Sequence, residues 1–210
     1  MRVLAPKGVA RRDLLAMLQA KRPWVDAKLR QQQQRMAVRP RYQYQTGERL
    51  PYLDTELTLH VMQGTRGACI READTLHVYW SPRSRKTVPE QTAQAVAQWY
   101  RAEALRLLEA KTQRLCDSVG LTCHGVNVRA TRSKWGHCTF DGRIQYNWQI
   151  VLAPTPVVDY LVAHEVSHLR HHNHSRAFWQ HVHAICPDYQ RLRVWLRDEG
   201  HRLILPPYER

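Results

Sequence analysis

The chain has 210 residues, of which 43% are hydrophobic, enough for one substantial domain or a main domain with a small appendage. Its apolar runs are too short to span a membrane, and residues 1–15 lack the apolar core of a signal peptide, so we expect a cytoplasmic protein without a membrane partner. Five cysteines, odd in number and without a C-x-x-C pair, are typical of a reducing compartment. The net charge of +14 favours polyanionic partners.

The positive charge is concentrated near the start of the chain. Residues 1–50 contain 12 Lys and Arg against 3 Asp and Glu, and most of the cations are arginine, which suits phosphate contacts. This basic N-terminal region is either a nucleic-acid-binding surface or a solubilising one. No zinc-finger, helix-turn-helix or RRM motif accompanies it, so both interpretations stay open.

The first part of the chain reads as a small basic α/β region. The pattern predicts a strand over Arg2–Ala5, a turn at residues 6–8, and two helical segments separated by Pro23. Alternating apolar residues between positions 42 and 80, with turn residues between them, predict a small antiparallel sheet. The basic stretch 81–86 is a plausible linker, so we expect a region 1–86 followed by a second domain, 87–210.

A long helix and two strands follow. Thr87 and Glu90 form a capping-box pattern, which predicts a helix from there to about Ser118, ended by Gly120. Short strands are expected over 126–129 and, after an Asp-Gly turn, over 144–150. The polar face of this last strand could border an active cleft and pair with an extended peptide, or the strand could be an ordinary edge strand.

The most informative stretch is the H-E-x-x-H pattern from His164 to His168. Thr155 as N-cap and Pro156 at the first helical position predict a helix whose other residues are mostly apolar, so it should be buried. His164 and His168 lie one turn apart and can hold one Zn²⁺, while Glu165 is placed to activate water rather than to bind the metal. A metal would also satisfy these buried polar groups.

A hydrolytic zinc site usually has a third protein ligand, and three histidines follow. His171 continues the same helical face, but three ligands in line on one helix make a poor tetrahedral corner. His174 is better placed, because Asn173 tolerates the left-handed conformation that ends helices and lets the chain turn back. His172 is the remaining candidate. Ser175 is expected to cap a further helix.

Several motifs together resemble the YgjP-like metallopeptidase family, a bacterial zincin-like family related to the SprT/Spartan and WLM groups. The resemblance covers nearly the whole chain. It is most specific at residues 133–138 (SKWGHC), 142–144 (GRI), 147–148 (NW), 159–160 (DY), 164–169 (HEVSHL), 173–175 (NHS) and 178–179 (FW).

The resemblance implies an α+β zincin-like domain in which the H-E-x-x-H helix packs on a small antiparallel sheet. The N-terminal α/β region precedes this domain in the sequence. It also implies zinc held by His164, His168 and His174, with Glu165 as the catalytic glutamate. Position 137 is His where the family usually has Ser. Family members usually have a further strand or hairpin before the Pro-Lys-Gly turn, so we expect an incomplete N-terminal sheet or a misassigned start site.

Three functions compete at this stage. The leading one is a zinc-dependent peptidase acting on a peptide or protein, with Glu165 as general base. The oxyanion needs a second donor, for which four residues of the neighbouring hairpin region are candidates: Arg132, Lys134, His137 and Tyr146. The alternatives are a nucleic-acid-associated protein and a non-catalytic module that zinc stabilises.

Overall fold

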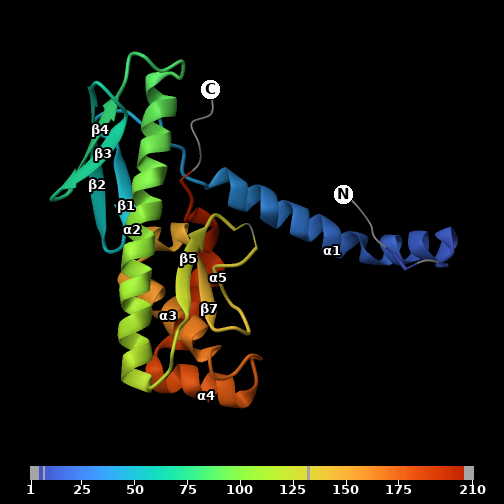
Figure 1. The fold of residues 1–210 in the computed structure, drawn as a ribbon. Helices are drawn as coiled ribbons and strands as arrows, with labels where there is room; N and C mark the ends of the chain where they lie inside the picture. Colours follow the sequence, from blue (N-terminus) through green and yellow to red (C-terminus); the bar gives the residue numbers. More distant parts are fainter. Residues whose placement is uncertain (1–4, 7, 132, 206–210) are drawn as a thin grey trace. The chain divides into compact units, whose positions relative to one another are not determined.

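The computed structural model describes residues 5–6, 8–131 and 133–205, which form the α+β fold that the sequence predicts (Figure 1). Of the predicted strand Arg2–Ala5, only Ala5 is described, and it belongs to no strand. By internal contacts the chain divides into one unit that ends at Arg39 and another that begins at Pro40. The domain division after residue 86 stays a prediction.

The helices of the described chain are α1 (Arg11–Ala37), α2 (Val88–Val119), α3 (Thr155–Ser167), α4 (Arg176–Ile185) and α5 (Tyr189–Glu199), with 3-10 turns η1 (Trp148–Leu152) and η2 (Gly200–Arg202). The strands are β1 (Arg49–Tyr52), β2 (Thr55–Gln63), β3 (Ala68–Glu72), β4 (Thr75–Trp80), β5 (Gly125–Arg129), β6 (Gly136–Cys138) and β7 (Arg143–Asn147). Within these residues, no helix combines the length and the apolar character that crossing a bilayer requires.

Helix α1 is continuous, which corrects the expected break at Pro23. A proline inside a helix removes one backbone hydrogen bond and tends to kink the helix, but its fixed φ is itself helical. Good helix formers precede Pro23 and resume at Ala27, and the helix continues through the proline.

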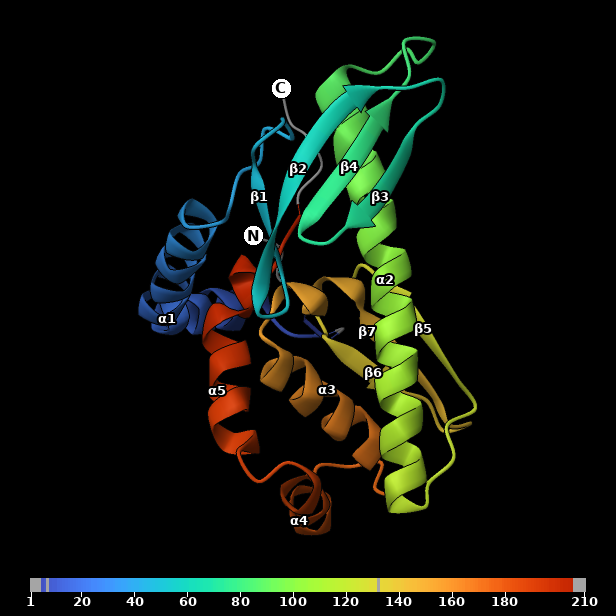
Figure 2. The same ribbon diagram turned by 90° about the vertical axis from the view of Figure 1, so that its left-hand side faces the viewer.

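Helix α2 begins and ends as the sequence predicts. The Thr87 hydroxyl accepts the Glu90 backbone N–H, the Glu90 carboxylate accepts the Thr87 N–H at 2.7 Å, and Gly120 ends the helix with a left-handed φ of 66°. The N-terminal sheet (β1 to β4) lies beside the first half of α2, whereas the second sheet (β5 to β7) and α3 lie beside its second half (Figures 1 and 2). One helix thereby supports both sheets.

The N-terminal sheet is mixed rather than purely antiparallel as expected. Its strand order is β1-β2-β4-β3, with β2 and β4 parallel and the other two pairs antiparallel. After β3 the chain reverses direction at Ala73-Asp74, and β4 then lies between β2 and β3. It therefore pairs with β3 in the antiparallel and with β2 in the parallel direction. Alternation in a sequence shows which face of a strand is buried, but it does not show which neighbour the strand chooses.

The second sheet corrects two further expectations. Its order is β5-β7-β6, so β7 is the central strand and cannot be the edge that pairs with a peptide; β6 is the edge nearer the histidines. The predicted strand 144–150 also ends early, at Asn147. There the Asn147 side chain accepts the Gln149 N–H at 3.1 Å and starts the 3-10 turn η1.

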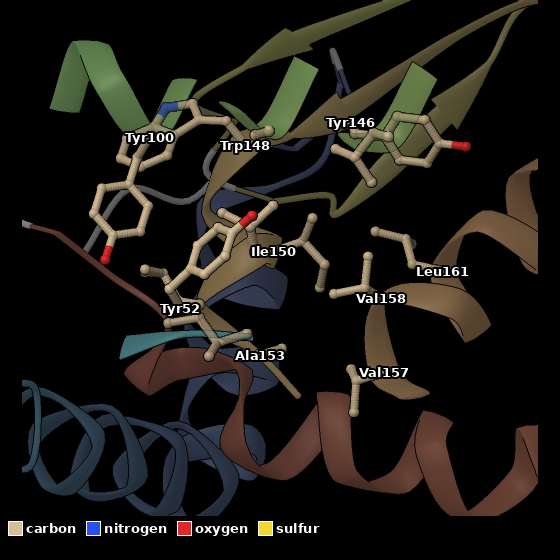
Figure 3. Close-up of a cluster of buried hydrophobic side chains, with 14 of the residues drawn as sticks. Tyr52, Tyr100, Tyr146, Trp148, Ile150, Ala153, Val157, Val158 and Leu161 are labelled. Atoms are coloured by element: carbon tan, nitrogen blue, oxygen red, sulfur yellow. The ribbon is translucent and has the colours of Figure 1, made fainter. Parts of the chain in front are cut away.

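The core is shared between the two sheets (Figure 3). Aromatic rings from the N-terminal sheet and α2 meet the apolar residues of η1 and α3, and Tyr52 and Tyr100 stack edge to face with centroids 6.2 Å apart. Their hydroxyls are satisfied, because Tyr52 donates to Glu103 at 2.7 Å and Tyr100 donates to the Pro51 carbonyl at 2.8 Å. The N-terminal sheet therefore stabilises the region that contains the histidines.

The N-terminal sheet also caps α3. The N-cap is Pro154 rather than the expected Thr155, and the cap residue supplies no side-chain hydrogen bond. Instead the Thr155 N–H donates to a carboxylate oxygen of Asp54, in the turn between β1 and β2, at 3.1 Å. A carboxylate at this end also favours the positive pole of the helix dipole.

We therefore expect Asp54→Ala to lower the free energy of unfolding by about 1 kcal/mol, as the loss of a helix N-cap does. Urea denaturation of the purified chain measures this. Glu56→Ala is the control, because Glu56 lies two residues further along and makes only an exposed ion pair with Arg49 at 3.5 Å. Equal losses in the two variants would contradict a capping role for Asp54.

Candidate metal centre

The H-E-x-x-H stretch lies at the C-terminal end of α3, where the chain leaves the helix. The helix ends at Ser167 with His168 as its C-cap, and the N–H groups of residues 168, 169 and 170 each bond to the carbonyl three residues earlier. These tight 3-10-type bonds turn the chain. His171 therefore lies beyond the helix and not on the face that carries His164 and His168. Asn173 has no positive φ, so the prediction of a left-handed turn at Asn173 is wrong.

The turn brings three histidines together, here called the histidine cluster: His164, His168 and His174. One ring nitrogen from each lies within 4.8 Å of those of the other two. Nε2 of His164 and Nε2 of His174 are only 3.1 Å apart. The cluster combines two residues at the end of α3 with one from the loop before α4. Nitrogen donors from two directions suit a tetrahedral metal better than three in line on one helix.

Packing and one hydrogen bond orient these rings. Nδ1 of His168 lies 3.0 Å from the His171 carbonyl oxygen, which can only accept, so Nδ1 carries the proton and Nε2 keeps its lone pair. The His168 ring stacks on Phe178 at 4.5 Å, and the His174 ring stacks on Trp179 at 5.6 Å. Both aromatic residues belong to α4, which Ser175 caps as predicted.

The protonation state of the cluster also suits a metal. Burial lowers the pKa of His164 to about 3, helped by the neighbouring His168 and His174. Burial likewise lowers the pKa of His168 and of His174. All three rings are therefore neutral at neutral pH, which is the form that binds metal. Nδ1 of His164 is buried and has no hydrogen-bond partner within the described chain.

Glu165 lies beside the cluster and is only 3% exposed. Burial raises its pKa to about 8, against the opposing effect of Lys134. Its carboxyl group packs directly on the backbone of Gly136 in β6, so closely that a Cβ at position 136 would lie 2.2 Å from Oε1 and 2.6 Å from Cγ of Glu165. Only glycine leaves room for this contact.

Between α3 and β6 runs the histidine cleft, of about 520 Å³, whose walls include the histidine cluster and Glu165. Lys134 and His137, two of the candidates for stabilising an oxyanion, are among the residues that line it. It is also lined by Tyr160 and by Phe140, whose side chain is 89% exposed, and the sequence reasoning missed both. Tyr160 could have been found, because it precedes His164 by one helical turn.

The two other candidates for stabilising an oxyanion, Tyr146 and Arg132, are not among the residues that line the histidine cleft in the described chain. Tyr146 is fully buried, and its hydroxyl pairs with the Thr112 hydroxyl of α2 at 2.9 Å, so the structure contradicts a role in the cleft. Its place in the alternating strand put it on the buried face, against α2. Arg132 lies outside the described residues.

Comparison with known proteins places the chain in a family. The family model described as "YgjP-like, metallopeptidase domain" matches residues 1–199. Among solved structures, the metallopeptidase zymogen abylysin of Pyrococcus abyssi matches with 20% identity and a TM-score of 0.39, over 43% of this chain and 93% of that one. No curated protein matches.

We expect Gly136→Ala to lower the free energy of unfolding by about 1–3 kcal/mol, because the new methyl group overpacks a buried contact and displaces Glu165. Urea denaturation of the metal-free chain measures this. Gly67→Ala is the matched control, since the nearest atom to a Cβ there is the Tyr79 carbonyl oxygen at 3.8 Å. A Gly136→Ala protein as stable as the control would show that the contact is not tight.

Proposed function

This chain belongs to the YgjP-like metallopeptidase family, and we propose that it is a zinc-dependent peptidase whose reaction takes place in the histidine cleft. The observation that carries the proposal is the convergence of three neutral imidazoles, within 4.8 Å, beside a buried glutamate. A structural metal site needs only ligands. A buried Glu165 that is kept out of the ligand set is what a hydrolytic site adds.

His164, His168 and His174 would hold the zinc, because three nitrogen donors with one position left open are typical of catalytic zinc sites. The donor set also fits the ion chemically: the rings are neutral, and His168 presents Nε2 because its Nδ1 is engaged. When bound, zinc supplies Lewis-acid chemistry, polarising a peptide carbonyl and lowering the pKa of water.

Glu165 would transfer the proton that moves during hydrolysis. It takes a proton from the attacking water and delivers it to the amine that leaves, which makes it base and then acid. In the metal-free chain, burial places its pKa at about 8, close to neutrality, where one group can both accept and donate. Lys134 and His137, which line the cleft, remain the candidates for stabilising the oxyanion.

The peptide would bind along β6. The bonds from Asn147 N–H to the Trp135 carbonyl and from Thr139 N–H to the Arg143 carbonyl flank the β6–β7 ladder. Because hydrogen-bonded and non-bonded pairs alternate, Gly136 and Cys138 turn their N–H and C=O groups away from β7, toward the free edge. An extended substrate can pair with these groups by edge addition, which the sequence analysis considered for the strand over 144–150.

Metal content tests the proposed ligands. After zinc reconstitution and gel filtration, plasma mass spectrometry should find about one zinc per chain, as for a single three-histidine site. His164→Ala, His168→Ala and His174→Ala should each lose it. His172→Ala is the matched control, because His172 lines the same cleft but lies outside the cluster. Zinc retained by His174→Ala and lost with His172→Ala would reassign the third ligand.

Turnover tests the role of Glu165. We expect Glu165→Gln to keep zinc and to lose hydrolysis by a factor of about 10² or more, because the amide cannot accept the proton. The assay is mass spectrometry of a proteome-derived peptide library. Glu109→Gln, at an exposed position on α2, should match the wild type. A zinc-loaded wild type that cuts no peptide would instead indicate a zinc-stabilised binding module.

A further inference from the structure

A second cleft, here called the basic cleft, lies between the edge strand β3 and the first half of α2. It has a volume of about 820 Å³, and none of the residues that line it also lines the histidine cleft. One wall is the loop before β3 with the start of that strand, and the other is a face of α2. Figure 2 shows β3 beside the first half of α2. The loop between β4 and α2 closes one end.

The loops around the basic cleft are fixed by side-chain hydrogen bonds. The Ser81 N–H donates to the Gln91 side chain at 2.9 Å, and the Gln91 amide donates back to the Lys86 carbonyl at 3.0 Å, which ties both ends of the β4–α2 loop to the helix. The Ser81 hydroxyl also donates to the Thr65 carbonyl at 3.2 Å, so the two loops are joined. The cleft is therefore shaped before any ligand binds.

The charges in the basic cleft all have one sign. Arg66, Arg83 and Lys86 line it, and no Asp or Glu is among the described residues that do. Lys86 donates to the Gln94 side chain at 2.6 Å, but neither guanidinium has an ion-pair or hydrogen-bond partner in the described chain. Because like charges that line one cleft repel one another, an anion bound among them would lower their electrostatic energy.

We propose that the basic cleft binds the phosphodiester backbone of a single-stranded nucleic acid. Unpaired guanidinium groups suit phosphate, to which they can donate two parallel hydrogen bonds. The α2 wall adds the exposed Gln98 amide, which can bond to base edges, and the half-buried Trp99 ring, against which a base can stack. The net charge of +14 raises the local concentration of any such polyanion.

Fluorescence anisotropy with a fluorescein-labelled oligodeoxythymidine tests the proposal on the full chain. At low salt we expect Arg66→Glu with Arg83→Glu to weaken binding by a factor of about 10 or more. Because each phosphate contact adds about 0.7 to the salt slope of a single-strand complex, we expect the slope to fall by roughly 1.4. Arg66→Gln with Arg83→Gln, which only neutralises the charges, should give a smaller loss in the same direction.

The matched control is Arg114→Glu with Arg129→Glu, which changes the net charge equally at exposed positions outside the basic cleft. Equal losses in both double variants would overturn the proposal, since binding would then follow overall charge. So would full binding by the cleft variant, or competition by polyglutamate as strong as that by unlabelled oligonucleotide, which would indicate an acidic protein partner. Glu165→Gln should bind normally, which separates this test from that of the peptidase.

Discussion

The contact between Glu165 and Gly136 is the constraint on which the histidine cleft depends. It brings α3 and β6 so close that a single Cβ would lie 2.2 Å from the carboxylate. This approach buries Glu165, and the burial raises its pKa toward neutrality. It also places the free edge of β6 beside the end of α3, so one glycine links the position of the proposed general base to the edge on which a substrate would lie.

Helix α2 holds α3 and β6 in this position. The hydroxyl pair of Thr112 and Tyr146 joins α2 to β7, which positions β6 through their antiparallel pairing. Lys111 of α2 donates to the Asp159 carboxylate of α3 at 2.5 Å, which joins α2 to α3 directly. The first half of α2 supports the N-terminal sheet, whose Asp54 reaches the start of α3. Helix α2 is therefore long enough to contact both sheets, and it fixes their positions relative to each other.

Local signals in the sequence were sufficient to predict most of the helices. The capping box at Thr87, the serine cap at Ser175 and Gly120 each act within one turn of backbone, so their residue types predict them directly. His174 does lie with His164 and His168 in the histidine cluster, but the chain does not bring it there in the expected way. The chain turns through tight backbone bonds after Ser167, and not through a left-handed Asn173.

The errors concern choices that no local pattern encodes. Alternation placed Tyr146 on a buried face, but only the position of α2 decides that its hydroxyl meets Thr112. The parallel pairing of β2 with β4, and the central place of β7, depend on which edge a later strand occupies. The closeness of β6 to α3 is likewise a tertiary fact: the motif at residues 133–138 marked Gly136 for attention, but it did not show that the glycine leaves room for Glu165.

The histidine cluster is energetically unfavourable on its own, and this sets it apart from an ordinary buried polar group. Nε2 of His164 and Nε2 of His174 lie 3.1 Å apart, so without a metal one of these rings must donate its N–H to the other, and Nδ1 of His164 is buried without a hydrogen-bond partner in the described chain. Each unsatisfied buried polar group costs about 1–3 kcal/mol. Protonation gives no relief, because burial and mutual repulsion hold the pKa values down. Of the ligands that could compensate, a cation shared among the three rings satisfies the most nitrogen atoms at once, which is why the geometry favours a metal over a hydrogen-bonded network.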